Sequence, residues 1–87
     1  MKYSDFKSGK LFSIICYSGD VVGSYATYIY LTLSVNRAEV KAKLVCTEYC
    51  ANTANRQLEF PNNTIHRIHQ KSWEEIMAGK LYESREL

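Results

Sequence analysis

Residues 24–35 read SYATYIYLTLSV, and no other stretch of the chain shows so regular a pattern. β-Branched and aromatic residues dominate it, and both kinds favour the extended backbone of a strand. The odd positions from 27 to 35 hold Thr, Ile, Leu, Leu and Val, and they alternate with Ala, Tyr, Tyr, Thr and Ser. A period of two is typical of a strand with two different faces. We therefore predict one long strand over residues 24–35.

A second strand of similar length is predicted over residues 38–48, which read AEVKAKLVCTE. Asn36-Arg37 lies between the two strands, and asparagine tolerates the positive φ that a two-residue hairpin turn requires. In such a hairpin Leu33 lies opposite Val40. A shift of one residue would move every side chain to the other face, so the turn determines which residues are buried together.

The predicted hairpin separates an apolar face from a more polar one. The apolar face, which we expect to be buried, consists of Ile29, Leu31, Leu33, Val40 and Leu44. The second face, which we expect to be exposed, carries Tyr28, Tyr30, Thr32, Lys41 and Lys43.

The segment before the hairpin predicts a further strand. Residues 10–17 alternate in the same way, and a turn at Gly19-Asp20 would place Phe12 opposite Thr27. This register adds Phe12 to the apolar face of the hairpin. Two short strands are expected after the hairpin, at residues 57–60 and 64–69.

The end of the chain predicts a helix. Ser72 and Glu75 have the spacing of a capping box, in which a serine side chain and a glutamate three residues later satisfy the first free N–H groups. This cap favours a helix from Trp73 to Tyr82. One longer helix over residues 65–83 is the alternative.

Together these elements predict an α+β fold: a four- or five-stranded antiparallel β-meander with a C-terminal helix packed on one face. The chain has 87 residues and a mass of 10.0 kDa, which suffices for one hydrophobic core. We therefore expect residues 1–87 to form a single domain.

The composition narrows the classes of protein. Hydrophobic residues make up 46% of the chain and the formal net charge is +2, so a disordered tail is excluded. The apolar stretches are far shorter than the roughly 20 residues that a membrane span needs. Three cysteines without a secretory signal favour free thiols and a cytoplasmic location.

Two pairs of residues raise the question of a metal site. Cys46 and Cys50 are followed by His66 and His69, and zinc prefers sulfur and nitrogen ligands that occur in such close pairs. The histidine spacing is one residue shorter than in common zinc fingers. Residues 64–69 as a strand would also direct the two rings to opposite faces. We predict no metal and no cofactor, although zinc binding by these four residues stays open.

The sequence also gives little support for an enzyme. It contains no phosphate-binding loop, no nucleophile elbow, no zinc-protease motif and no dinucleotide fingerprint. A chain of this size offers little room for an enclosed substrate pocket. We therefore predict a protein without catalytic activity.

The expected exposed face of the hairpin is the candidate binding site. It carries the five residues Tyr28, Tyr30, Thr32, Lys41 and Lys43. Tyrosine is enriched at protein interfaces, so we predict a protein-binding module that acts as an inhibitor or adaptor by occupying the surface of its partner. The alternative is single-stranded nucleic acid, whose bases stack on aromatic rings beside cations. Self-association through exposed edge strands is a further expectation.

Overall fold

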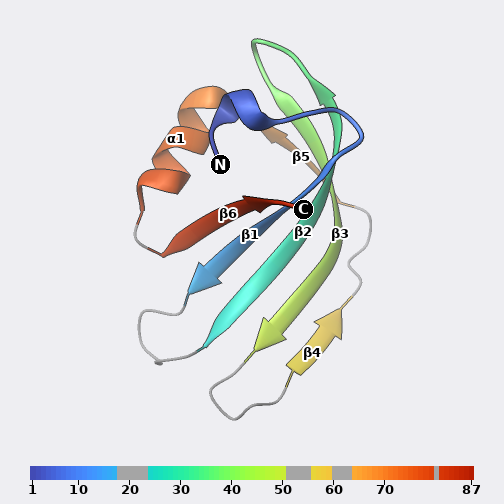
Figure 1. Ribbon diagram of the computed structural model, residues 1–87, viewed down its shortest axis with the longest axis vertical. Helices are drawn as coiled ribbons and strands as arrows, with labels where there is room; N and C mark the ends of the chain where they lie inside the picture. The colour runs from blue at the N-terminus through green and yellow to red at the C-terminus, as the bar shows by residue number, and fades with distance from the viewer. Residues whose placement is uncertain (18–23, 51–55, 60–63, 80) are drawn as a thin grey trace.

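The computed structural model describes residues 1–17, 24–50, 56–59, 64–79 and 81–87. Its elements in chain order are the 3-10 helix η1 (Tyr3–Asp5) and the strands and helix β1 (Leu11–Tyr17), β2 (Tyr25–Val35), β3 (Val40–Cys50), β4 (Arg56–Glu59), β5 (Ile65–Ile68), α1 (Gln70–Ala78) and β6 (Tyr82–Glu86). The α+β class is confirmed: an antiparallel sheet is joined by a helix near the C-terminus (Figure 1).

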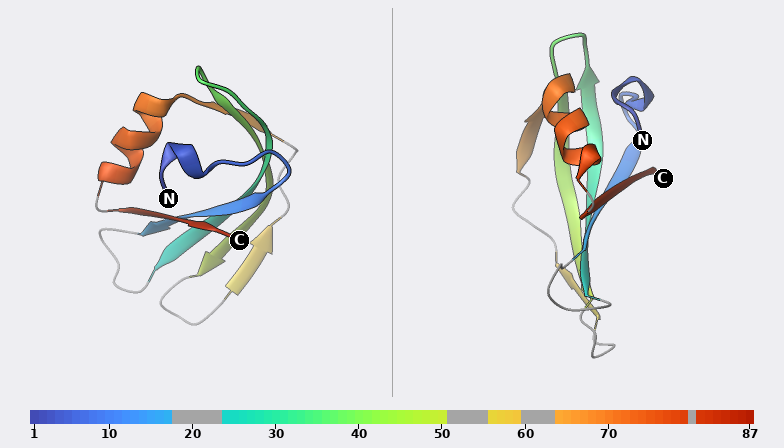
Figure 2. Two further views of the ribbon diagram at one scale, coloured as in Figure 1. Left: turned by 45° about the horizontal axis from the view of Figure 1, so that its top comes forward. Right: turned by 90° about the vertical axis from the view of Figure 1, so that its left-hand side faces the viewer.

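The strands form one antiparallel sheet in the order β4-β3-β2-β1-β6, and β5 pairs with the other half of β3. The first four strands follow one another as a meander, as predicted. The sheet is strongly curved, and η1 and α1 lie on its concave side (Figure 2). We call this concave side the inner face and the opposite side the outer face.

The hydrophobic core lies on the inner face and is dominated by aromatic rings. Phe6 packs edge-on against Phe12 and Trp73, with ring centroids 5.0 Å and 4.9 Å away. Phe12 stacks on Tyr30 at 5.2 Å. The indole N–H of Trp73 donates a hydrogen bond to the carbonyl oxygen of Met1 at 3.0 Å, so the buried ring keeps its polar group satisfied. The core is completed by Val40, Ala42 and Leu44.

The predicted faces of β2 are reversed in the structure. Thr32 is 2% exposed and Tyr30 is 9% exposed, whereas Leu33 is 39% exposed. The core prediction was right for β3, because Val40 and Leu44 are buried. It was wrong for β2, where Ile29 and Leu31 lie on the outer face and the tyrosines lie inside.

The physical reason is an extra residue in the pairing of β2 with β3, next to their connection. Val35 lies opposite Val40, so four residues separate the strands instead of two, and the side-chain oxygen of Asn36 accepts the N–H groups of Ala38 and Glu39 at 2.8 Å each. The pairing then passes from Ser34 directly to Thr32, with Leu33 as an extra residue. One extra residue exchanges the two faces of every residue beyond it.

A second irregularity follows lower in the same pair of strands. Tyr30 lies opposite Leu44 and Ile29 opposite Cys46, so Val45 is an extra residue in β3. This bulge exchanges the faces of β3 and leaves those of β2 unchanged, which keeps Tyr28 on the inner face.

The register of β1 also differs from the prediction. Phe12 lies opposite Tyr30 rather than Thr27, so the first connection is longer than the predicted turn. The Gly19-Asp20 turn itself lies outside the described residues. Phe12 is nevertheless buried, as expected, because its partner Tyr30 lies on the inner face.

The C-terminal third contains a strand followed by a helix, as predicted, and not the alternative of one long helix. The helix begins at Gln70 rather than at Trp73, so Ser72 lies in its first turn and not at its cap. It ends at Ala78, and the N–H of Gly79 donates to the carbonyl oxygen of Ile76. Tyr82–Glu86 form β6, which the sequence pattern did not reveal, and β6 pairs with β1.

The reversed faces predict opposite outcomes for two neighbouring substitutions. Tyr30→Thr should lower the free energy of unfolding by about 3 kcal/mol or more, because it removes a ring from the core. Leu31→Thr should cost about 1 kcal/mol or less, because Leu31 lies on the uncovered face. Urea unfolding of both variants measures the difference, and a larger loss for Leu31→Thr would contradict the described faces.

Candidate functional site

The outer face of the sheet carries apolar side chains from β1, β2 and β5. Leu11 lies opposite Leu31, and Tyr17 lies opposite Tyr25 with ring centroids 6.3 Å apart. On β3, Lys43 lies between Leu31 of β2 and Ile65 of β5. We call the following residues the outer patch: Leu11, Ile15, Tyr17, Tyr25, Ile29, Leu31 and Ile65.

No helix among the described residues covers this patch, because η1 and α1 both lie on the inner face (Figure 2). Leu11 is 41% exposed and Ile65 is 57% exposed. The central members of the patch are half-buried. Apolar side chains gathered on one uncovered face are unusual for a monomeric protein and commonly mark a binding surface.

Charged side chains of both signs border the outer patch. Lys41 and Lys43 lie on β3, beside Arg67 of β5, whose guanidinium is 3.7 Å from the carboxylate of Glu39. At the other end of the sheet Glu83 lies opposite Ile15, and its carboxylate is 3.8 Å from the guanidinium of Arg85. The patch therefore has a basic end and an end at which a carboxylate and a guanidinium lie together.

Tyr17 and Glu83 form a polar contact at the end of the patch that carries Glu83 and Arg85. The phenol of Tyr17 donates a hydrogen bond to a carboxylate oxygen of Glu83 at 3.2 Å. The pKa of Tyr17 is raised, first by partial desolvation and then by the negative charge of Glu83. Both effects keep the hydroxyl protonated and able to donate.

The structure does not bring the five predicted binding residues together. Tyr30 and Thr32 are buried in the core, and Tyr28 packs against it from the inner face. Lys41 and Lys43 lie on the outer face, as predicted. The prediction of one exposed Tyr/Lys face is therefore wrong, because the extra residue Leu33 turns the three β2 side chains inward.

The four residues considered for zinc are also separated. Cys46 lies on the outer face opposite Ile29, whereas His66 lies on the inner face with its ring edge-on to Tyr30. The Nδ1 atom of His69 is 2.9 Å from the carbonyl oxygen of Ala38. The side chain of Cys50 lies outside the described residues. In the part of the chain that the structure describes, no three His, Cys, Asp or Glu side chains could hold a metal ion together.

Two phenols on the inner face have perturbed acidity. Burial raises the pKa of Tyr30. The pKa of Tyr82 is raised mainly by the charge of the neighbouring Cys16 and by a hydrogen bond to that residue. Both rings therefore stay neutral over a wider pH range than a free tyrosine.

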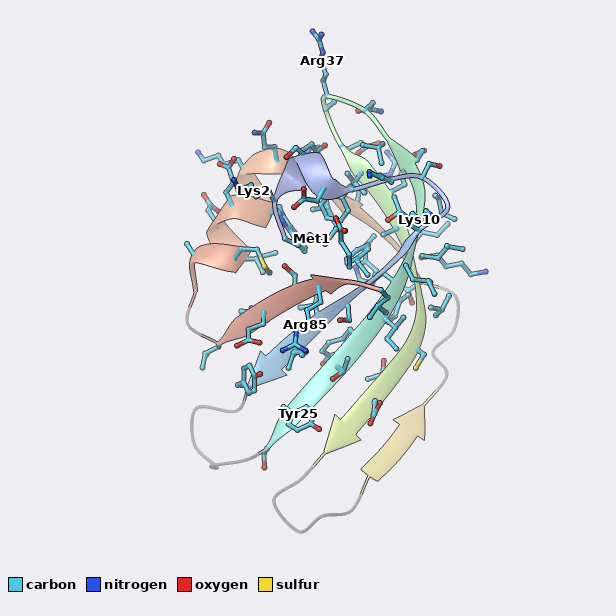
Figure 3. The ribbon with its side chains drawn as sticks, in the orientation of Figure 1. Met1, Lys2, Lys10, Tyr25, Arg37 and Arg85 are labelled. Carbon is cyan, nitrogen blue, oxygen red and sulfur yellow. The ribbon has the colours of Figure 1, made fainter. Side chains whose placement is uncertain are left out.

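A second candidate surface is an open groove of about 940 Å³ at the upper end of the inner face. Three segments far apart in the sequence line it: the N-terminal residues, the β2–β3 connection and α1. Figure 3 shows Arg37 at the tip of that connection, with Met1 and Lys2 beside α1. Its apolar lining includes Tyr3, Val35 and Met77. Sequence reasoning missed this groove because only the folded chain brings these segments together.

Comparisons with protein-family models, with curated proteins and with solved structures found no match to this chain. Among the described helices, none has the length and apolar character needed to cross a membrane.

The raised pKa of Tyr30 predicts a loss of stability in alkali. A pKa above the unfolded value of 10.0 means that the folded chain retains the phenolic proton more strongly. The stabilisation is complete below that value and is lost as the pH rises through the folded pKa. Urea unfolding should therefore show a fall in stability above pH of about 10, and the fall should be smaller in Tyr30→Phe. An equal fall in both proteins would contradict the burial of the phenol.

Proposed function

We propose that this chain is a non-catalytic protein-binding module whose partner docks on the outer face of the sheet. The observation that carries the proposal is the uncovered outer patch, whose apolar side chains lie on β1, β2 and β5. Burying apolar surface is worth about 25 cal/mol per Å², so covering this face supplies a driving force for association.

The make-up of the patch suits a protein partner. Tyr17 and Tyr25 give it aromatic side chains with a polar end, the kind that is enriched at protein interfaces. Leu11 and Leu31 supply an apolar centre next to them. A partner with an apolar ridge would fill this centre, while the charges at the border would select its orientation.

The charges do not form one basic track for nucleic acid. Lys41 and Lys43 could meet phosphates at one end of the patch, but Arg85 at the other end is 3.8 Å from the carboxylate of Glu83. Nucleic acid carries a phosphate at every nucleotide, and a carboxylate beside a cation weakens its binding. The alternative of single-stranded nucleic acid also loses its stacking platform, because Tyr30 is 9% exposed.

The proposed role is that of an inhibitor or adaptor. A face of this kind acts by occupying the partner's surface and needs no chemistry of its own. The complementary partner surface would be apolar at its centre and acidic where it meets Lys41 and Lys43.

Two glutamate substitutions test the proposal. Leu11→Glu places a charge inside the outer patch, whereas Ile76→Glu places the same charge on α1 at a site of similar exposure, 41% against 38%. From a nuclease-treated lysate of the cells that naturally produce it, the tagged chain should capture one protein in a fixed molar ratio to itself. Ile76→Glu should retain this capture, and Leu11→Glu should weaken it about tenfold or more because a charge must be desolvated.

Two results would contradict the proposal. Equal capture by Leu11→Glu and the unchanged chain would mean that the outer patch is not the binding surface. Salt-sensitive binding of a mixed oligonucleotide that is lost in Lys43→Ala would favour the nucleic-acid alternative.

A further inference from the structure

Strand β6 forms one edge of the sheet. It pairs with β1 on one side, and no described strand pairs with its other side. Figure 1 shows β6 running from the end of α1 toward the C-terminus of the chain. Its five residues read YESRE, so the negative Glu83 precedes Ser84 and the positive Arg85 follows it. An unpaired edge is a template on which another strand can add.

The hydrogen bonds to β1 reveal which backbone groups are free at this edge. The N–H of Tyr17 donates to the carbonyl oxygen of Leu81 at 2.8 Å. The N–H of Leu87 donates to the carbonyl oxygen of Leu11 at 3.1 Å. In an antiparallel pair the backbone groups of alternate residues point toward the partner strand. The odd-numbered residues of β6 therefore face β1, and the N–H and C=O groups of Tyr82, Ser84 and Glu86 point to the open edge.

These three residues are compatible with a second copy of the same strand. If two β6 strands pair antiparallel with Ser84 at the centre, each Ser84 meets its counterpart, and Tyr82 meets Glu86 of the second copy. All three positions have their backbone groups on the open side. The strand is therefore self-complementary in its backbone hydrogen bonding.

The side chains select this same register. Glu83 of one copy lies opposite Arg85 of the other, so two pairs of opposite charges flank the centre. A shift by two residues in either direction would place Glu83 opposite Glu83 or Arg85 opposite Arg85, and like charges directly opposite each other destabilise a sheet. Within one chain the guanidinium of Arg85 is 3.8 Å from the carboxylate of Glu83, and both side chains are exposed, 67% and 51%, so each can also meet its counterpart on the second copy. Tyr82 is also 40% exposed, so its ring can pack beside the side chain of Glu86 of the second copy.

We propose that the chain forms a symmetric dimer in which two β6 strands pair edge to edge around Ser84. The dimer joins the two curved sheets into one continuous sheet. It does not depend on the proposed partner of the outer patch, because the pairing uses the backbone edge and the charges of β6.

A charge exchange tests the proposed register. Sedimentation over a concentration series should show a species of twice the 10.0 kDa chain mass. Glu83→Arg alone and Arg85→Glu alone each place like charges opposite each other twice, so each should raise the dimer dissociation constant about tenfold or more. An equal mixture of the two variants restores opposite charges and should form a mixed dimer close to the original affinity. Failure of the mixture to associate better than either variant would overturn the proposal.

A backbone substitution tests the edge itself. Ser84→Pro removes the central N–H on the open side, and its fixed φ is tolerated in an edge strand. The N–H is not used by β1, so the fold should survive while the dimer is lost. Ser84→Ala is the matched control, because it keeps the N–H and the described residues offer no hydrogen-bond partner to the buried Ser84 hydroxyl. A monomeric unchanged chain, or a dimer that persists in Ser84→Pro, would contradict the proposal.

Discussion

Leu33 is the extra residue in the pairing of β2 with β3, and it determines which side of β2 turns toward η1 and α1. Beyond it Thr32 and Tyr30 lie on the inner face, where Phe12 stacks on Tyr30. Without it, Leu31 would turn inward and the aromatic rings would remain outside. The aromatic core and the apolar outer patch are therefore two consequences of one irregularity in the backbone.

The inner face is closed by elements from both ends of the chain. Trp73 of α1 packs against Phe6, which follows η1, and its indole N–H is satisfied by Met1. Because η1 and α1 both lie on the concave side, no described helix covers the apolar side chains of the convex side. The outer patch and the β6 edge adjoin each other, since Glu83 belongs to β6 and bonds to Tyr17 of the patch.

The sequence pattern was sufficient for the existence of most strands, for the helix and for the α+β class. It was insufficient for the faces of β2, because Leu33 and Val45 look like regular members of alternating strands and nothing local marks them as bulges. It also missed β6, since YESRE carries charges at positions where a covered strand would show apolar residues. That composition fits an uncovered edge strand, and it also suits the end of a helix. Because of the bulge at Leu33, the predicted tyrosines lie on the inner face and the candidate site on the outer face. Lys41 and Lys43 lie on the outer face, as the pattern predicted.

The bulge at Leu33 places the tyrosines of β2 inside and its leucines outside. Nuclear Overhauser contacts between the backbone protons of β2 and β3 measure this register without any substitution. We expect cross-strand contacts of Thr32 with Ala42 and of Tyr30 with Leu44. Contacts of Thr32 with Lys41 and of Tyr30 with Lys43, as a two-residue turn would produce, would contradict this register.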